Sequence, residues 1–217
     1  MREHAWLIAD RQSAGRGRQG RTWFDGAGNF MGSSVVRLRA GDPPPASLAL
    51  VAGLALHTAA APLVPPPLRA QLKWPNDVLI GGAKLAGILL EREGDAVIVG
   101  IGVNLSAAPA LADRETIALT AFGPAPDRDT FARALAGEFA EALAQWRAAG
   151  LAPLLAHWQD AAHPIDAPLV VGEPGETALR GTFGGLTGDG ALRLCLADGT
   201  VRVIHAGEVR LAAPGTP

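Results

Sequence analysis

The chain has 217 residues and a mass of 22.3 kDa, which allows one large domain or a medium domain followed by a small one. Its 19 Lys and Arg residues against 21 Asp and Glu residues give a net charge of −2, so bulk electrostatics does not hold it to nucleic acid or anionic lipid. Hydrophobic residues make up 48% of the chain, which excludes wholesale disorder. The single cysteine, Cys195, cannot form an internal disulfide, and a reducing, cytoplasmic location is expected.

The first half of the chain reads as strands around one long apolar helix. Residues 5–9 predict a strand that runs into a loop rich in glycine and arginine, and residues 29–38 predict a second strand. Three prolines at 43–45 open a helix predicted over about 46–61. This helix is mostly alanine and is broken by a proline, so a buried helix is favoured over a membrane span. Three further strands are predicted at 69–74, 84–91 and 96–105.

A tight hairpin and a regular helix are the clearest local signals that follow. Gly81-Gly82 reads as a hairpin turn between two apolar stretches. Over 127–148, apolar residues recur with helical spacing, Asp127 or Asp129 can cap the start, and a glycine ends the helix. A short helix is predicted to follow at 151–159.

The pattern of apolar residues and glycines changes near 162–164. Short apolar strands with frequent glycine turns are predicted at 165–171, 177–184, 191–196, 200–205 and 208–211. These strands indicate a small five-stranded barrel or sandwich. We therefore expect a larger domain over 1–162 and a small C-terminal domain over 163–217.

A loop at 10–23, with the sequence D-R-Q-S-A-G-R-G-R-Q-G-R-T-W, carries the first chemical signal. Four arginines and three glycines fall within it, namely Arg11, Arg16, Arg18, Arg21, Gly15, Gly17 and Gly20. Glycines let the backbone bend while guanidinium groups and backbone N–H groups gather around phosphate oxygens. Gly/Arg tails that bind RNA are long and terminal, whereas this loop is single and lies between strands. A solvated charged loop is less favoured, because four like charges this close repel unless an anion joins them.

A second group of polar residues surrounds the hairpin in residues 73–91, K-W-P-N-D-V-L-I-G-G-A-K-L-A-G-I-L-L-E. Only Lys73 and Lys84 among the basic residues are lysines, and although codon bias explains most of that imbalance, it singles these two out. Asn76 and Asp77 could be ordinary turn residues, and Asp77 is also a candidate metal ligand. Lys84 is harder to explain as structure, because an apolar core strand gains nothing from an ammonium group.

The third motif, G-I-G-V-N-L at 100–105, ends an apolar strand with two glycines and an asparagine. Glycines on a central strand indicate close approach of another backbone or of a flat ligand. A β-bulge explains them equally well, and both interpretations stay open at this point.

Four motifs together resemble those of the biotin protein ligases: G-R-G-R-x-G-R-x-W at 15–23, K-W-P-N-D at 73–77, K-L-A-G-I-L at 84–89 and G-I-G-V-N at 100–104. Their order and spacing match over nearly the whole chain, and G-E-V-x-L at 207–211 fits the small C-terminal domain of that family. The resemblance implies an α/β (α+β) fold, similar to class II aminoacyl-tRNA synthetases and biotin ligases. A mixed β-sheet with helices on one face would precede a small C-terminal SH3-like β-barrel.

The resemblance also implies a ligase that acts in two steps. Biotin's carboxylate attacks the α-phosphate of ATP to give biotinyl-5′-adenylate and release pyrophosphate. A lysine of the biotin carboxyl carrier protein of acetyl-CoA carboxylase then takes the biotinyl group and releases AMP. Mg²⁺ is expected together with ATP. Because two anions must be joined, fixed cations are expected to do most of the catalysis.

Particular residues receive roles from the same resemblance. The catalytic residues implied are Lys84, Arg16 and Arg18. The biotin-binding positions implied are Gln12, Gly15, Arg16, Lys84 and Gly87. The nucleotide-binding positions implied are Arg16, Arg18, Arg21, Trp23, Asn76 and Asn104. For a metal, the only candidate is Asp77.

Two alternatives remain from the sequence. One is a lipoate-protein ligase-like transferase with the same adenylation chemistry, which the G-R-G-R-x-G loop disfavours. The other is a non-catalytic biotin or adenylate-binding module, because family members usually carry a Ser-Thr-Asn segment before the Gly-Arg loop and none occurs here. No helix-turn-helix pattern precedes the loop, so no DNA partner is expected. No membrane partner is expected either, and a homodimer is one option for the oligomeric state.

Overall fold

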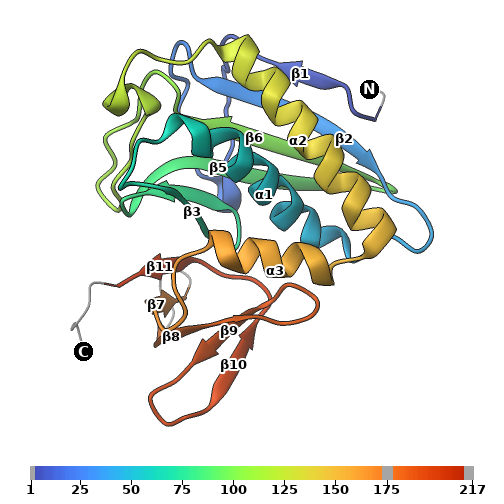
Figure 1. The fold of residues 1–217 in the computed structure, drawn as a ribbon, viewed down its shortest axis with the longest axis vertical. Coiled ribbons are helices and arrows are strands. Elements are labelled where there is room, and N and C mark those ends of the chain that lie inside the picture. The colour runs from blue at the N-terminus through green and yellow to red at the C-terminus, as the bar shows by residue number, and fades with distance from the viewer. Residues whose placement is uncertain (1–2, 173–177, 213–217) are drawn as a thin grey trace.

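Two antiparallel β-sheets, one of them covered by helices, make up the molecule (Figure 1). The structure is a computed structural model that describes residues 3–172 and 178–212. The first sheet has the strand order β1-β2-β6-β5-β4-β3. Its strands are β1 (Trp6–Ile8), β2 (Phe30–Arg37), β3 (Ala70–Lys73), β4 (Asp77–Ile80), β5 (Ala83–Glu93) and β6 (Ala96–Val103).

The strand pairs of this sheet are all antiparallel in the described part of the chain, so the expectation of a mixed sheet was wrong. The connections explain the difference. Strands β3 to β6 follow one another through short turns, and each turn reverses the chain. At the β4–β5 turn, Gly81 and Gly82 both have positive φ, 58° and 88°, as a two-residue hairpin of type I′ requires. The crossover from β2 through α1 (Leu48–Ala60) leads to the opposite edge of the sheet, so it places no parallel strands side by side.

Three helices cover one face of the first sheet (Figure 1). They are α1, α2 (Arg128–Ala149) and α3 (Ala152–Ala161), and their bounds lie close to those predicted. At the start of α2, the Asp127 carboxylate accepts a hydrogen bond from the backbone N–H of Thr130 at 2.8 Å, so the predicted cap is confirmed. Gly150 ends the helix with φ of 74°.

The apolar segment Pro45–Leu63, which contains α1, is long and apolar enough to cross a membrane by length and composition, and it is the one such helix among residues 3–172 and 178–212. Half of it is buried inside the fold, where α1 packs against β3, β5, α2 and α3. Leu48, Val51 and Leu56 are completely buried there. Packing in the core therefore explains the apolar composition, as the sequence indicated.

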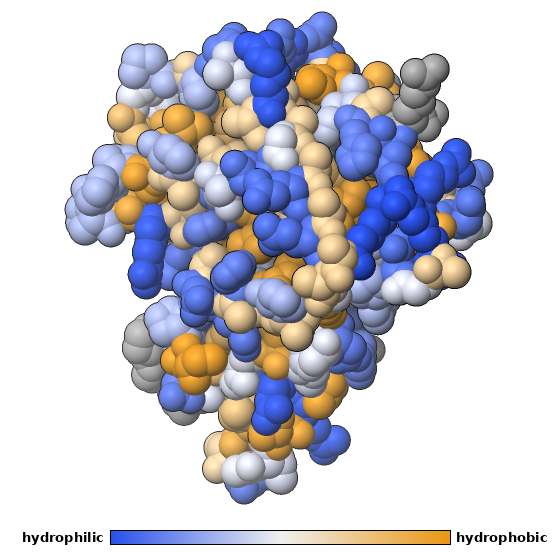
Figure 2. Space-filling model, turned by 45° about the vertical axis from the view of Figure 1, so that its right-hand side comes forward, coloured by the Kyte–Doolittle hydropathy of each residue, from blue (hydrophilic) through white to orange (hydrophobic). Residues whose placement is uncertain are grey.

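The second sheet has the strand order β10-β9-β8-β7-β11 and forms the narrower lower part of the molecule (Figures 1 and 2). Its strands are β7 (Pro168–Val171), β8 (Leu179–Leu186), β9 (Leu192–Cys195), β10 (Val201–Ile204) and β11 (Val209–Leu211). All five predicted strands are present. Within the described residues, β10 and β11 are the two edges and no pairing between them closes a barrel.

Residues 162–167 connect the two sheets, and the predicted domain boundary falls in this connection. The division into two domains stays a prediction. Hydrogen bonds nevertheless cross from the first sheet to the second. Lys73 Nζ donates to Val209 O at 2.9 Å, and Trp74 Nε1 donates to Gly190 O at 3.0 Å. The end of β3 is therefore tied to the C-terminal sheet beside the polar motif K-W-P-N-D.

Candidate active site

A cavity of about 710 Å³ lies on the face of the first sheet that the helices leave uncovered. The alternation along β6 explains its floor: Val99, Ile101 and Val103 belong to the core, so Gly100 and Gly102 point to the opposite face. Glycines there leave room that side chains would fill. The predicted site residues that line the cavity are Gln12, Arg16, Arg18, Arg21, Trp23, Asn76, Asp77, Lys84, Gly87 and Asn104.

The indole of Trp23 lies directly on Gly87 and Gly102. A Cβ on Gly102 would come within 2.2 Å of Trp23 Cε2, and a Cβ on Gly87 would come within 3.1 Å of Trp23 Cζ3. Gly100 and Gly102 pair in regular register with both β2 and β5, so the bulge interpretation was wrong; what approaches Gly102 is a side chain, not the backbone or ligand that was expected. The flat group that approaches is the chain's own indole. Trp23 Nε1 is buried without a hydrogen-bond partner.

The two lysines of the chain meet at one buried carboxylate. Lys73 Nζ lies 2.8 Å from Asp77 Oδ2, and Lys84 Nζ lies 2.6 Å from Asp77 Oδ1. The side chains of Lys73, Lys84 and Asp77 are 11%, 17% and 6% exposed. Burial by itself raises the pKa of Asp77, but the charges and hydrogen bonds of both lysines outweigh it and hold that pKa well below its usual range. Asp77 is therefore a carboxylate at neutral pH, and the three groups together carry one positive charge.

Lys84 also contacts the floor of the cavity. Its Nζ lies 5.7 Å from the centroid of the Trp23 ring, and a Cβ on Gly87 would come within 3.1 Å of the same atom. The neighbouring loop fixes its backbone, because Lys84 N donates to Glu115 O at 2.9 Å and Ile117 N donates to Lys84 O at 3.0 Å. The ammonium group is thus placed in the cavity wall by both its backbone and its side chain.

The arginines of the Gly-Arg loop reach partners that are distant in sequence. Arg18 donates to Asn76 Oδ1 at 3.1 Å and to Gly207 O at 3.2 Å. Arg21 pairs with Glu208, and this bond is the largest cause that raises the pKa of Arg21. No acidic residue stands between positions 11 and 24 of the chain, whereas the fold supplies carboxylates and carbonyls from the segment that leads into β11 and from the turn after β3.

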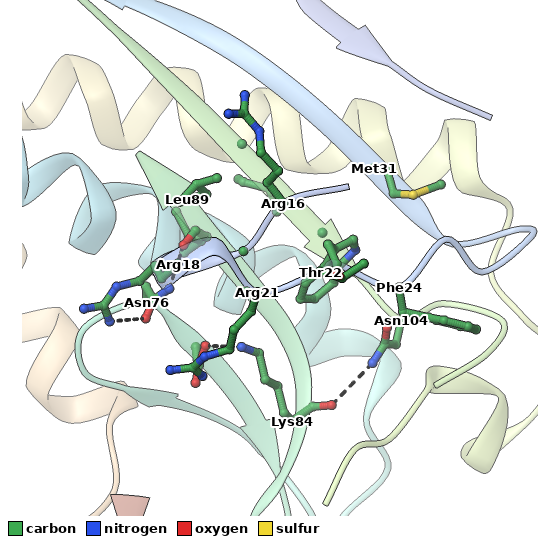
Figure 3. A pocket seen from close by; sticks show the side chains of 18 of the residues that line it. Arg16, Arg18, Arg21, Thr22, Phe24, Met31, Asn76, Lys84, Leu89 and Asn104 are labelled. Atoms are coloured by element: carbon green, nitrogen blue, oxygen red, sulfur yellow. Dashed lines mark hydrogen bonds and ion pairs between the residues drawn. The ribbon is translucent and has the colours of Figure 1, made fainter. Parts of the chain in front are cut away.

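Arg16 differs from the other arginines that line the cavity. Its Nη2 lies 3.1 Å from Glu91 Oε1, its side chain is 70% exposed, and it points away from Arg21 and Lys84 (Figure 3). Arg11, the fourth arginine, pairs with Asp25 at 2.6 Å and does not line the cavity. The four arginines of the loop therefore differ in how exposed they are and in whether they line the cavity.

Three other predicted residues have structural partners. The backbone N–H of Gln12 donates to Asp25 Oδ1 at 2.9 Å, and its side chain lines the cavity. Gly15 does not line the cavity; its carbonyl accepts from Trp23 N at 2.9 Å, and a Cβ there would lie 2.7 Å from Gln12 Oε1. The Asn104 amide donates to Lys84 O at 3.4 Å and to Ile117 O at 3.2 Å (Figure 3). Gly15 and Asn104 therefore shape the loops around the site.

Sequence reasoning missed several residues of the cavity wall. Met31 enters from β2, and Arg114 and Thr116 enter from the loop that runs beside Lys84. Glu208 enters from the segment that leads into β11. Burial raises its pKa, but the hydrogen bond and charge of Arg21 and the charge of Arg114 outweigh burial and lower it. The G-E-V-x-L motif could have pointed to Glu208, but no motif marks Arg114.

The carboxylates present do not fit a divalent cation. Both oxygens of Asp77 face ammonium groups, at 2.8 and 2.6 Å, and a cation would have to displace two charges of its own sign. Within residues 3–172 and 178–212, no group of three or more His, Cys, Asp or Glu side chains could hold a metal ion. The surroundings of Asp77 therefore do not support it as a metal ligand, and no chemical step of the site is assigned to Mg²⁺.

Comparison with known proteins gives two family matches. Residues 3–105 match the model described as the Biotin/lipoate A/B protein ligase family. Residues 170–211 match the model described as the Biotin protein ligase C terminal domain. The two matches cover the first sheet with the Gly-Arg loop and the lysine hairpin, and most of the second sheet.

Relatives and solved structures agree with these matches. The chain is 41% identical over 216 residues to the biotin--[acetyl-CoA-carboxylase] ligase of Paracoccus denitrificans, with 94% of this chain and 89% of that protein covered. It is 39% identical to the Mycobacterium tuberculosis protein of the same name, with 94% and 77% covered. Its fold is similar to the Aquifex aeolicus biotin protein ligase solved with biotin and ATP, with a TM-score of 0.85, 24% identity and 98% and 91% of the chains covered. This chain belongs to the biotin protein ligase family.

Proposed function

We propose that the chain is an ATP-dependent biotin–protein ligase that activates biotin as biotinyl-5′-AMP and transfers it to a lysine of the acetyl-CoA carboxylase carrier. One observation carries this function: the Gly-Arg loop and the two lysines converge on one cavity whose floor is made of glycines and Trp23. The relatives from Paracoccus and Mycobacterium that carry this activity in their names support it.

The charges of the site suit the first step. The carboxylate of biotin and the α-phosphate of ATP repel, and the pentavalent transition state concentrates more negative charge on the phosphoryl oxygens. Lys84 is fixed at the cavity wall, and Arg18 and Arg21 line the same cavity. Cations that are already in place stabilise the developing charge without reorganisation, and that is the largest contribution such a site makes. Arg16 can swing in from the surface once a phosphate is present.

The second step needs an incoming amine and an exit for AMP. The neutral amine of the carrier lysine attacks the carbonyl carbon of biotinyl-adenylate, an amide forms, the C–O bond to AMP breaks, and the amine proton leaves to solvent. Glu208 and Val209, at the start of β11, line the cavity, so the C-terminal sheet borders the site that a carrier domain would have to reach. Lys84 and the loop arginines would hold the phosphate of the departing AMP.

A biotin-dependent exchange of labelled pyrophosphate into ATP tests the activation step. Exchange with biotin and none with lipoate is expected. Exchange with lipoate instead would favour the lipoate-ligase alternative. Binding of biotin or of its adenylate without any exchange would favour the non-catalytic alternative.

Finer features complete the proposal. The match of 170–211 to the C-terminal domain of biotin protein ligases supports an SH3-like barrel there, with the larger domain over 1–162. A near-neutral charge supports a ligase that does not bind DNA or a membrane. One cysteine in the whole chain supports a cytoplasmic location. A homodimer is the oligomeric state we would test first, by sedimentation.

A further inference from the structure

The two lysines create a chemical conflict in a protein that makes an activated acyl group. A mixed anhydride reacts with any neutral amine within reach, and the whole chain has only two side-chain amines, Lys73 and Lys84. Both lie in or beside the cavity, and Lys84 is part of its wall. The site must therefore keep these amines from competing with the lysine of the carrier.

The contacts of Asp77 explain how the two lysine amines can be kept from reacting with the activated biotin. Each lysine nitrogen lies against one oxygen of the same carboxylate, at 2.8 and 2.6 Å, and Lys73 also donates to Val209 O at 2.9 Å. These contacts are ion pairs, and a nitrogen in its ammonium form has no free electron pair to attack with. We propose that Asp77 holds the side-chain nitrogens of Lys73 and Lys84 in two salt bridges, so that Lys84 serves as a cation and neither lysine takes the biotinyl group itself.

The charge balance shows what loss of the carboxylate would do. With Asp77 present, two ammonium groups and one carboxylate carry one net positive charge in a buried place. Without it, two buried like charges would face each other, and a buried ammonium beside another cation loses its proton readily. Among the other groups, the charge of Asp77 acts on Arg114 and that of Lys73 acts on Glu208 and His163, while Arg18 bonds the neighbouring Asn76 and Arg21 pairs with Glu208. Glu208 is the one carboxylate among them, and it is already paired with Arg21 and Arg114, so it does not replace Asp77 at the lysines.

The unwanted reaction is a complete acyl transfer. The neutral Nζ of Lys84 attacks the carbonyl carbon of biotinyl-adenylate, and an N–C bond forms. The C–O bond to the phosphate of AMP breaks, AMP leaves with the electron pair, and the amide nitrogen loses its extra proton to water. The product is a stable biotinyl amide on the enzyme, which blocks its own site.

The test supplies preformed biotinyl-5′-adenylate, so it does not depend on whether the chain can activate biotin. This role rests on the proposed ligase activity, but the pyrophosphate exchange described above can fail without affecting this experiment. Wild type and Asp77→Asn are incubated with the adenylate, denatured and analysed by intact mass and peptide mapping. Covalent biotin at Lys84 or Lys73 is expected to rise at least about tenfold in D77N, because two buried cations that have lost their shared carboxylate favour a neutral amine. Equal labelling of the two proteins would overturn the proposed role.

Two control variants separate this role from a general loss of charge. Glu91→Gln removes one carboxylate from the cavity without touching the lysines, and it should stay at the wild-type level of labelling. Asp77→Asn combined with Lys73→Met restores the single positive charge, and labelling of Lys84 should fall back toward the wild-type level. Strong labelling of E91Q, or undiminished labelling of the double variant, would contradict the account.

A second reagent covers the case in which D77N folds but does not bind the adenylate. N-hydroxysuccinimidyl acetate acylates amines without needing the site, and the reaction rate of each lysine is read by mass spectrometry. Faster acylation in D77N than in the wild type is expected, and equal rates would count against the role. If circular dichroism shows that D77N is unfolded, Asp77→Ser removes the same charge with a smaller side chain and takes its place in both measurements.

Discussion

The Gly-Arg loop and the lysine hairpin both bring cations to one cavity, but they hold them in opposite ways. The side chains of Arg16 and Arg21 in the loop are 70% and 37% exposed, and their acidic partners come from other elements. The hairpin lysines are buried on one shared carboxylate. The arginines of the loop can therefore exchange their protein partners for a bound anion. The lysines of the hairpin are already fixed in the cavity before a ligand binds.

This difference assigns separate tasks to the two regions. A buried, preset charge stabilises a transition state without reorganisation, so the hairpin is suited to the chemical step. Exposed arginines cost little to move, so the loop is suited to closing over a ligand and releasing it. The two regions meet at Trp23, which ends the loop and lies on the glycines of β5 and β6.

Lys84→Ala should have the largest effect, because it removes the preset cation. Asp77 keeps Lys73 as a partner, so the fold should remain intact. Loss of one stabilising group at a developing oxyanion typically costs on the order of 10²–10³ in rate. Rapid-quench measurement of biotinyl-adenylate formation, with circular dichroism as a check on folding, tests this expectation. A burst like that of the wild type would remove Lys84 from the mechanism.

Gly102→Ala should weaken biotin binding by about tenfold or more, equivalent to roughly 1.4 kcal/mol. The new Cβ would lie 2.2 Å from the Trp23 ring and force it off the floor where loop and hairpin meet. Gly100→Ala is the matched control, because its Cβ would meet the nearest atom at an ordinary 3.6 Å. Calorimetry of biotin binding compares the two variants, and equal affinities would show that the position of Trp23 is unimportant.

The loop should gain protection on ligand binding while the hairpin changes little. We expect amide exchange in residues 11–22 to slow by about tenfold when biotin and ATP are added, because exposed arginines exchange their protein partners for phosphate. Residues 84–89, already paired in the sheet, serve as the internal control. Equal exchange in the loop with and without ligands would contradict the division between adaptable and preset charge.

Glu208→Gln should have a small effect that depends on pH. Burial raises the pKa of Glu208. The hydrogen bond and charge of Arg21, together with the charge of Arg114, lower the pKa by more than burial raises it, so the folded-state pKa lies below the unfolded value. Its contribution is then present above the unfolded pKa, about 4.3, and is lost as the pH falls through the folded value. We expect E208Q to lose about 0.5–1 kcal/mol of unfolding free energy at pH 7. Urea titrations should show that deficit shrinking below about pH 4; a constant deficit would exclude the ion pair as its cause.

Much of the fold could be predicted because its signals are local. The cap at Asp127, the Gly81-Gly82 turn and the glycine-punctuated strands after residue 164 each depend on neighbours in sequence. The resemblance implied a mixed sheet, and the periodicity of the sequence could not correct it, because periodicity indicates strands but says nothing of the partner beside each strand. The direction in which neighbouring strands pair depends on which connections are hairpins. It also depends on where the crossover from β2 through α1 places β3.

The residues of the site could be named, but not their partners. The motifs identified Lys84, Arg18 and Trp23, and all three line the cavity. The contact between Trp23 and Gly102 joins residues far apart in the chain, and no local pattern reveals it. Asp77 was a candidate metal ligand because a carboxylate in a turn gives no sign of its neighbours. Only the fold brings two ammonium groups to it.

Transfer of biotin to a carrier is the most direct measurement of the central claim that this cavity makes and delivers biotinyl-adenylate. The full chain is incubated with biotin, ATP and a biotin carboxyl carrier domain, and the mass of each protein is followed over time. We predict that one biotinyl group appears on one carrier lysine, that a carrier with arginine at that lysine stays unmodified, and that Lys84→Ala slows the gain by about 10²-fold or more. No gain on the carrier, gain with lipoate instead of biotin, or an unchanged rate in the Lys84 variant would contradict the account.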